Sequence, residues 1–153
     1  MPVSVLVAAI AVGVMVSARL FMGVLILLGG GWASIVNVVI PIVVALLILY
    51  GIIVGQRLAW QWGRLLGLLG GVLLTLTAVG ILSKSAEGPG YVMIGVLLLL
   101  QGVPLFPMFF ALGTQGARTY FRLTCPQCGD AKPKGGNFLF TKAVCRKCNA
   151  SWT

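Results

Sequence analysis

The chain of 153 residues contains no histidine, and its only acidic residues are Glu87 and Asp130. A catalytic pair of carboxylates or a Ser-His-Asp triad cannot be built from this set of side chains. Charged residues make up 8% of the sequence, against about 25% in soluble domains. This leaves too little polar surface to cover a water-soluble globule, so the composition favours a membrane protein without an acid-base active site.

Apolar sequence fills most of the chain instead. Hydrophobic residues account for 59% of it, and the mean hydropathy is +1.08. Several apolar runs are long enough to cross a hydrocarbon core of about 30 Å at about 1.5 Å per residue. We expect an all-α membrane protein: a four-transmembrane-helix bundle with a small C-terminal zinc-ribbon (β-hairpin) module. The expected helices span residues 3–29, 33–55, 63–82 and 91–112 of a membrane domain at 1–112, and an interfacial linker at 113–123 leads to a cytoplasmic zinc ribbon at 124–153.

The first apolar run has some features of a secretory signal peptide. Val16-Ser17-Ala18 resembles a small-residue cleavage site. However, no lysine or arginine precedes the run, and the apolar sequence continues past Arg19. We therefore expect an uncleaved first helix.

Three polar residues interrupt the apolar helices and form a possible intramembrane polar site: Arg19, Asn37 and Gln101. An intramembrane charge is by default a functional candidate. The alternative is that Arg19 extends to the interface or pairs with carbonyl groups inside the bundle. Glu87 is its one plausible acidic partner. Asn37, which precedes a helix-kinking Pro41, can hydrogen-bond to a neighbouring helix.

Small residues mark one face of the third helix. Gly63, Gly67 and Gly71 recur at a spacing of four, which puts them on the same side. Small residues at this spacing let two helix backbones approach closely in a membrane. We expect this face to pack against another helix of the same chain, with contact to a second subunit as the alternative.

An interfacial hairpin is predicted between the second and third helices, over residues 56–64. Trp60 and Trp62 would anchor it at the membrane boundary, and Arg57 and Arg64 would lie among the head groups. Residues 1–112 loosely resemble small four-helix bacterial membrane proteins of unknown function, a resemblance carried by Gly51, Gly55, Arg57, Ala59, Trp60 and Trp62. It implies a helical bundle and brings no activity.

All four cysteines lie near the C-terminus, as Cys125-x-x-Cys128 and Cys145-x-x-Cys148. Each pair can form a tight turn, or knuckle, that points both sulfurs at one spot, and four thiolates suit a tetrahedral zinc ion. Iron in a rubredoxin-like site and two redox-active dithiols are the alternatives. With four sulfur ligands no coordination position stays open for substrate, which favours a structural metal.

The same segment resembles the zinc-ribbon family. The first knuckle reads Cys-Pro-x-Cys-Gly, the second reads Cys-x-x-Cys, and Trp152 matches the aromatic residue that often follows. The resemblance implies a metal-stabilised β-hairpin. The residues between the two pairs agree, because Gly135-Gly136-Asn137 is a turn signal and Phe138-Leu139-Phe140 is a short β-prone run. A segment this short needs the metal to fold.

Positive charge is distributed unevenly over the two ends of the expected bundle. Four spans put both termini on one side, together with Arg57, Arg64 and most cations of the C-terminal third. The positive-inside rule then puts both termini in the cytoplasm of a cell (inner) membrane protein. A reducing cytosol would also keep the thiols available for metal.

The leading functional hypothesis is a non-enzymatic membrane subunit that docks a partner through the ribbon. The partner would be another membrane subunit or a cytoplasmic protein, and a homo-oligomer is also compatible. A small oligomeric transporter or channel using Arg19, Asn37 and Gln101 is the main alternative. A thiol oxidoreductase is less favoured because both cysteine pairs lie in one inner-face tail at ribbon spacing. A nucleic-acid-binding ribbon is less favoured because lipid head groups already account for the basic charge.

Overall fold

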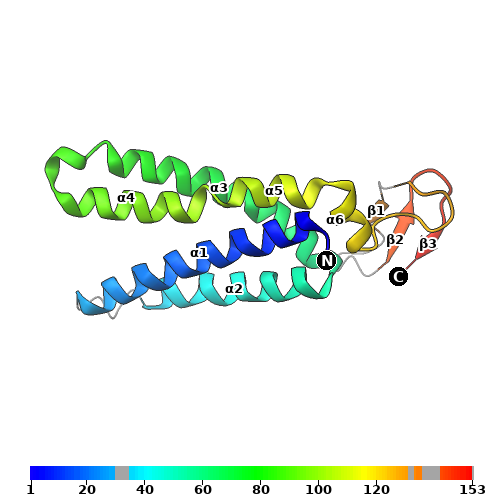
Figure 1. Cartoon of the computed structure of the whole chain (residues 1–153), viewed down its shortest axis with the longest axis horizontal. Coiled ribbons are helices and arrows are strands. Elements are labelled where there is room, and N and C mark those ends of the chain that lie inside the picture. The colour runs from blue at the N-terminus through cyan, green and yellow to red at the C-terminus, as the bar shows by residue number, and fades with distance from the viewer. Residues whose placement is uncertain (30–34, 131–132, 136–141, 153) are drawn as a thin grey trace.

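A computed structural model gives the fold of residues 1–29, 35–130, 133–135 and 142–152. An elongated bundle of helices carries a small sheet at one end (Figure 1). The helices are α1 (Val3–Leu28), α2 (Ile35–Val54), α3 (Arg57–Leu82), the short 3-10 helix η2 (Ser85–Glu87), α4 (Pro89–Gly102), α5 (Leu105–Gly113) and α6 (Gln115–Tyr120); the strands are β1 (Pro133–Gly135), β2 (Ala143–Cys145) and β3 (Ser151–Trp152).

Within the described residues, four helical spans are long and apolar enough to cross a membrane. They are α1, residues 36–54 of α2, α3, and α4 continued by α5. Each exceeds the roughly 20 residues needed for a bilayer core or comes within one residue of it. This is the organisation of a multi-pass membrane protein.

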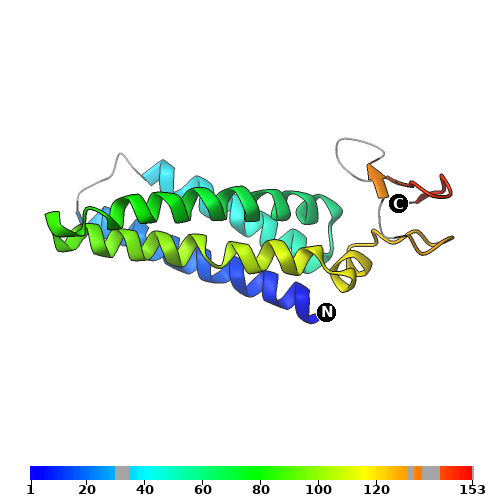
Figure 2. The same ribbon diagram turned by 90° about the horizontal axis from the view of Figure 1, so that it is seen from above.

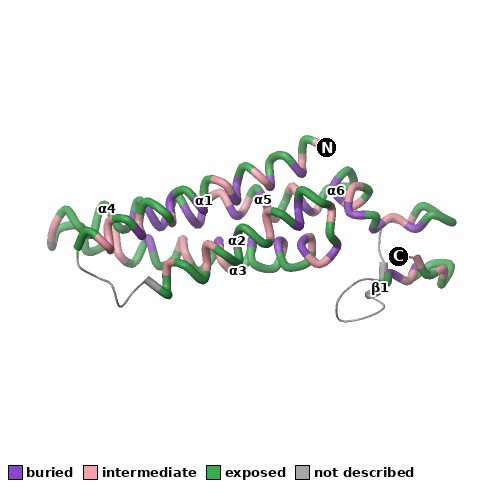
Figure 3. Tube along the Cα trace, turned by 90° about the horizontal axis from the view of Figure 1, so that it is seen from below, coloured by how far each residue is buried: buried purple, intermediate pink, exposed green. Residues whose placement is uncertain are grey.

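The buried residues lie along the sides of the helices that face one another, and exposed residues lie on the outside (Figure 3). Many of these exposed residues are large and apolar. A helix of a soluble protein would present polar residues there. The main cluster of buried side chains occupies the half of the bundle nearest the sheet, where α5 packs between α1 and α3. Its largest members include Ile52, Met108, Leu112 and Phe121.

The connection between α2 and α3 is shorter than the sequence analysis expected. The third helix begins at Arg57 and not at residue 63, so the predicted interfacial hairpin is the first two turns of α3. The reason is a Schellman ending of α2, in which Gln56 N donates to Gly51 O at 2.8 Å and Gly55 N to Ile52 O at 3.2 Å. Gly55 takes the left-handed conformation, with φ +76°.

The fourth span is broken near its middle. It begins two residues earlier than expected, because Pro89 suits the first helical position, where no amide donor is required. Gly102 ends α4, and α5 starts after Pro104. Pro104 and Pro107 lack amide donors, and Phe106 N instead donates to Val103 O at 3.2 Å, three residues back. This local change of pairing separates α4 from α5.

The expected linker at 113–123 contains α6, which turns away from α5 at the end of the bundle (Figure 2). Thr114 caps α6 by accepting a 3.3 Å hydrogen bond from Ala117 N on its hydroxyl. Beyond it, three short antiparallel strands pair in the order β1-β2-β3, with Lys134 opposite Val144 and Val144 opposite Ser151. The predicted turn at 136–137, the β-prone run at Phe138 and the residues at 33–34 lie outside the described parts.

Candidate functional site

Two knuckles of the same design hold the four cysteines. In the first, Cys125 N donates to Asp130 O at 2.9 Å and Gly129 N donates back to Cys125 O at 3.0 Å. The second repeats both bonds twenty residues later, at 2.8 Å and 3.1 Å, between Cys145 and the Asn149–Ala150 pair. The repeated pattern means that each knuckle presents its two sulfurs in the same way.

A left-handed residue closes each knuckle. Gly129 has φ +70° and Asn149 has φ +56°. The glycine is recognisable from sequence, but the role of Asn149 was missed. Asparagine is among the few side chains that enter this region readily, so its position four residues after Cys145 was the available signal.

The four sulfurs converge on one point. Cys125 Sγ lies 3.6 Å from Cys148 Sγ, and Cys128 Sγ lies 3.4 Å from Cys145 Sγ. All four Sγ atoms are within 4.8 Å of one another, and all four cysteines are free thiols. A tetrahedral metal with bonds of about 2.3 Å would set its sulfur ligands about 3.8 Å apart. The set therefore fits a metal ion held by four thiolates.

Backbone amides favour ionisation at this site. The pKa of Cys145 is lowered to about 7, chiefly by the backbone N–H of Cys148, with a further contribution from Lys147 N, 3.4 Å from the sulfur. The N–H of Asp130 also lowers the pKa of Cys128, but hydrogen bonding to Cys145, desolvation and the other two sulfurs raise it to about 12. One thiol of this pair thus ionises readily while its neighbour keeps its proton, and a bound cation would favour ionisation of both.

The segment that carries the cysteines is fixed to the helical bundle by a shared carbonyl. Arg122 O accepts a 3.1 Å hydrogen bond from Arg57 Nη2 and a 2.8 Å bond from Trp152 Nε1. Arg57 Nη1 also reaches Trp152 O at 3.5 Å. Arg57 was predicted to lie among lipid head groups. It is instead buried at the start of α3, where it faces the ribbon. A charged donor at a partly buried carbonyl is among the stronger hydrogen bonds.

Arg122 reaches this position because α6 ends in a second Schellman motif. Leu123 N donates to Arg118 O at 2.8 Å and Arg122 N to Thr119 O at 3.0 Å. Arg122 has φ +54°, where glycine is usual. The flanking Phe121 and Leu123 side chains are fully buried, so the chain between helices and ribbon is packed on both sides of the turn.

The tryptophans of the α3 start have separate roles. Trp60 Nε1 donates to Leu112 O at 2.7 Å, which joins α3 to the end of α5. The Arg64 guanidinium lies 5.2 Å from the Trp60 ring centre and 4.9 Å from that of Phe109. Trp62 is exposed on the outer surface. Tyr120 completes this end of the bundle by donating its hydroxyl to Ile53 O.

The three polar residues of the apolar helices meet at one place. Arg19 Nη1 donates to Gln101 Oε1 at 3.1 Å, and Arg19 Nη2 donates to Asn37 O at 3.1 Å. Asn37 takes part through its backbone. Pro41 explains why, because it lacks the amide that would normally bond to the carbonyl four residues earlier. Arg19 supplies the missing donor, and Gln101 Nε2 donates to Leu97 O at 3.1 Å.

The glycines of α3 face α5 and the end of α4. A Cβ on Gly67 would lie 3.0 Å from Met108 Cε and 3.3 Å from Leu105 O. A Cβ on Gly63 would lie 3.2 Å from Leu112 Cδ1, and one on Gly71 would lie 3.4 Å from Gly102 O. The structure therefore places this face in contact with helices of the same chain.

No family model, curated protein or solved structure matches this chain.

Proposed function

We propose that this chain is a non-enzymatic subunit of a cell (inner) membrane complex, docking a partner through a zinc-bound cytoplasmic ribbon. The convergence of four sulfurs within 4.8 Å carries the proposal. Four thiolates would complete the coordination of zinc and leave no position for substrate, so the metal would stabilise the fold. Zinc is preferred to iron because the first knuckle and Trp152 resemble those of the zinc-ribbon family.

The shape of the molecule supports a docking role. The two knuckles form the end of the protein farthest from the helices (Figure 1). Arg146 and Lys147 are exposed in the second knuckle, and Lys134 is exposed on β1. The bonds between Arg57, Arg122 and Trp152 fix the base of the ribbon, which reduces the entropy lost when a partner binds its tip.

Charge distribution supports the orientation. The start of α3, which carries Arg57 and Arg64, and α6, which carries Arg118 and precedes Arg122, lie at the ribbon end of the bundle with the N-terminus (Figure 1). Lys84 follows α3, whose last turn lies at the opposite end. The positive-inside rule assigns the ribbon end to the cytoplasm, whose reducing conditions suit thiolate ligands.

Purification of the tagged full-length chain from native membranes in mild detergent tests the proposal. We expect a partner in fixed stoichiometry, with amine-specific cross-links at Lys147 or Lys134. The double substitution Arg146→Glu with Lys147→Glu should release that partner while the bound metal is retained. Lys84→Glu, at the other end of the bundle, is the matched control and should retain it. A chain that purifies without any stoichiometric partner contradicts the docking role.

A further inference from the structure

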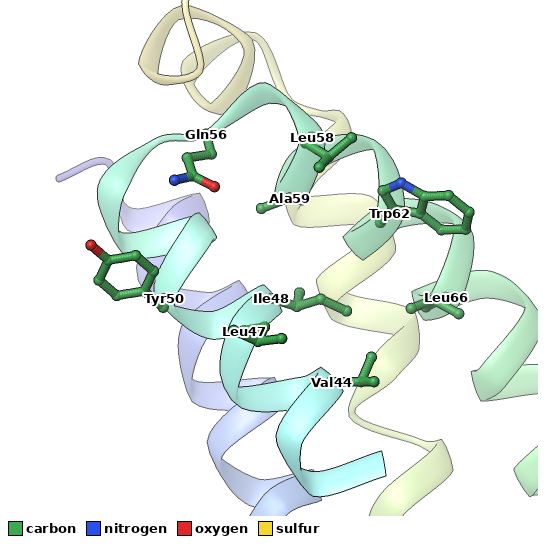
Figure 4. Close-up of a pocket in the computed structure, with 9 residues that line it drawn as sticks. All are labelled: Val44, Leu47, Ile48, Tyr50, Gln56, Leu58, Ala59, Trp62 and Leu66. Atoms are coloured by element: carbon green, nitrogen blue, oxygen red, sulfur yellow. The ribbon is translucent and has the colours of Figure 1, made fainter. Parts of the chain in front are cut away.

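A row of cavities, called the seam here, begins between α2 and α3 and runs into the bundle, where α1, α4 and α5 also line it. Near the ribbon it begins as a groove of about 540 Å³ whose rim includes Tyr50, Gln56 and Trp62. Figure 4 shows the lining side chains, which come from the last turns of α2, the connecting turn and the first turns of α3. Apart from these polar-tipped residues at the rim, the lining is aliphatic.

Two smaller cavities continue the row into the bundle. A cavity of about 200 Å³ shares Val44, Ile48 and Leu66 with the groove, so the two adjoin. A further cavity of about 200 Å³ shares Met15, Pro41 and Leu74 with the middle one. Its lining also includes both members of the Arg19–Gln101 hydrogen bond. The apolar row therefore has a polar end.

At that polar end, the positive charge of Arg19 meets only neutral groups among the side chains that the structure describes. The acceptors that Arg19 finds among the described residues, Gln101 Oε1 and Asn37 O, are both neutral. Arg19 Nε is buried and has no acceptor in the same part of the chain. A guanidinium stays ionised under all ordinary conditions, and a charge without a counter-charge in a low-dielectric site is costly. An anionic group in the adjoining cavity would offset this cost.

We infer that the seam binds an amphiphile with one alkyl chain and an anionic head group. The head group would lie against Arg19 and Gln101, and the alkyl chain would follow the aliphatic row towards Trp62. A small inorganic anion would leave the apolar row unfilled, and a neutral amphiphile would leave the charge unbalanced. The site is separate from the cysteine cluster and from the proposed docking surface.

Photolabelling tests the inference with the full-length chain in phosphatidylcholine nanodiscs. The probe is palmitate that carries a diazirine on its alkyl chain, and labelled residues are identified by mass spectrometry. We expect labels on the seam side of α2 and α3. Unlabelled palmitate should compete, while hexadecanol and sodium acetate should compete at least tenfold more weakly. Equal competition by hexadecanol, or by acetate, overturns the inference.

Two substitutions examine the two ends of the site. Arg19→Gln removes the charge, and Val44→Trp fills the row at a half-exposed position that lines both the groove and the middle cavity. Each should reduce seam labelling at least tenfold. Val43→Trp is the matched control, since Val43 is similarly exposed on α2 and lines none of the three cavities. If the Arg19→Gln variant does not fold, the Val44→Trp variant and the competition series test the inference. Unchanged labelling of the Val44→Trp variant overturns the inference.

Discussion

The helical bundle and the ribbon are stabilised in opposite ways. The bundle has long apolar helices whose outer faces stay exposed, and it is held by close packing and a few buried polar contacts. The ribbon has three short strands and few buried apolar side chains among its described residues. A metal held by its four sulfurs would supply the stability that a core provides elsewhere. The two regions should therefore fail independently, under different perturbations.

The largest expected effect follows from removing one ligand. Cys145 is fully buried and belongs to both a strand and the cluster, so Cys145→Ser should abolish stoichiometric metal binding. Structural zinc contributes about 10–16 kcal/mol to folding at pH 7, and the ribbon should unfold without it. Metal analysis and hydrogen exchange would measure this, with Ser151→Ala as a control that keeps all four ligands. Loss of helical circular dichroism as well would show that the two regions are not independent.

An intermediate effect is expected from overpacking the bundle. Gly67→Leu places new atoms against Met108 and the Leu105 carbonyl, which should destabilise the helices by about 1–3 kcal/mol. Gly80 lies on the same helix with open space around its missing Cβ, so Gly80→Leu is the matched control. Unfolding in a graded series of denaturing detergent gives the difference, and metal content should stay unchanged in both variants. Equal stability of the two variants contradicts the intrachain packing of this face.

The smallest effect concerns the join between the regions. Trp152→Phe keeps the aromatic ring but removes the donor to Arg122 O, which should cost about 1 kcal/mol. Faster hydrogen exchange at β3 and faster proteolysis at the base of the ribbon would report the loss, with metal still bound. Trp62→Phe changes an exposed ring on α3 and serves as the control. An unchanged exchange rate at β3 would mean that the bond from Trp152 to Arg122 O does not help to fix the ribbon.

The length of the apolar runs was enough to predict four helical spans, because a run of about twenty apolar residues is typical of a helix that crosses a membrane. The start of α3 was misplaced by six residues. Tryptophan and arginine around residue 60 were read as boundary signals, whereas the structure uses Trp60 and Arg57 as hydrogen-bond donors to α5 and to the ribbon turn. Contacts between residues far apart in the sequence produce no local pattern, so the start of α3 could not be predicted from them.

The cysteine cluster was predictable from the sequence, whereas the pairing of the polar residues inside the bundle was not. Ligand spacing reveals a cysteine cluster, since both sulfurs of a knuckle must be close in sequence. The meeting of Arg19, Gln101 and Asn37 O joins residues up to 82 positions apart, and the backbone role of Asn37 depends on Pro41. The three residues stand out in sequence as polar interruptions, but their pairing requires the helix arrangement.

Arg122 holds bundle and ribbon together with its main chain, and its side chain remains exposed. The join therefore depends on the left-handed φ of residue 122 and on its carbonyl oxygen, and not on an arginine side chain. Substitution of Arg122 by glycine or asparagine should leave the contact between bundle and ribbon unchanged. Valine and isoleucine resist φ near +54°, so either of them should separate the two regions although all four cysteines are kept.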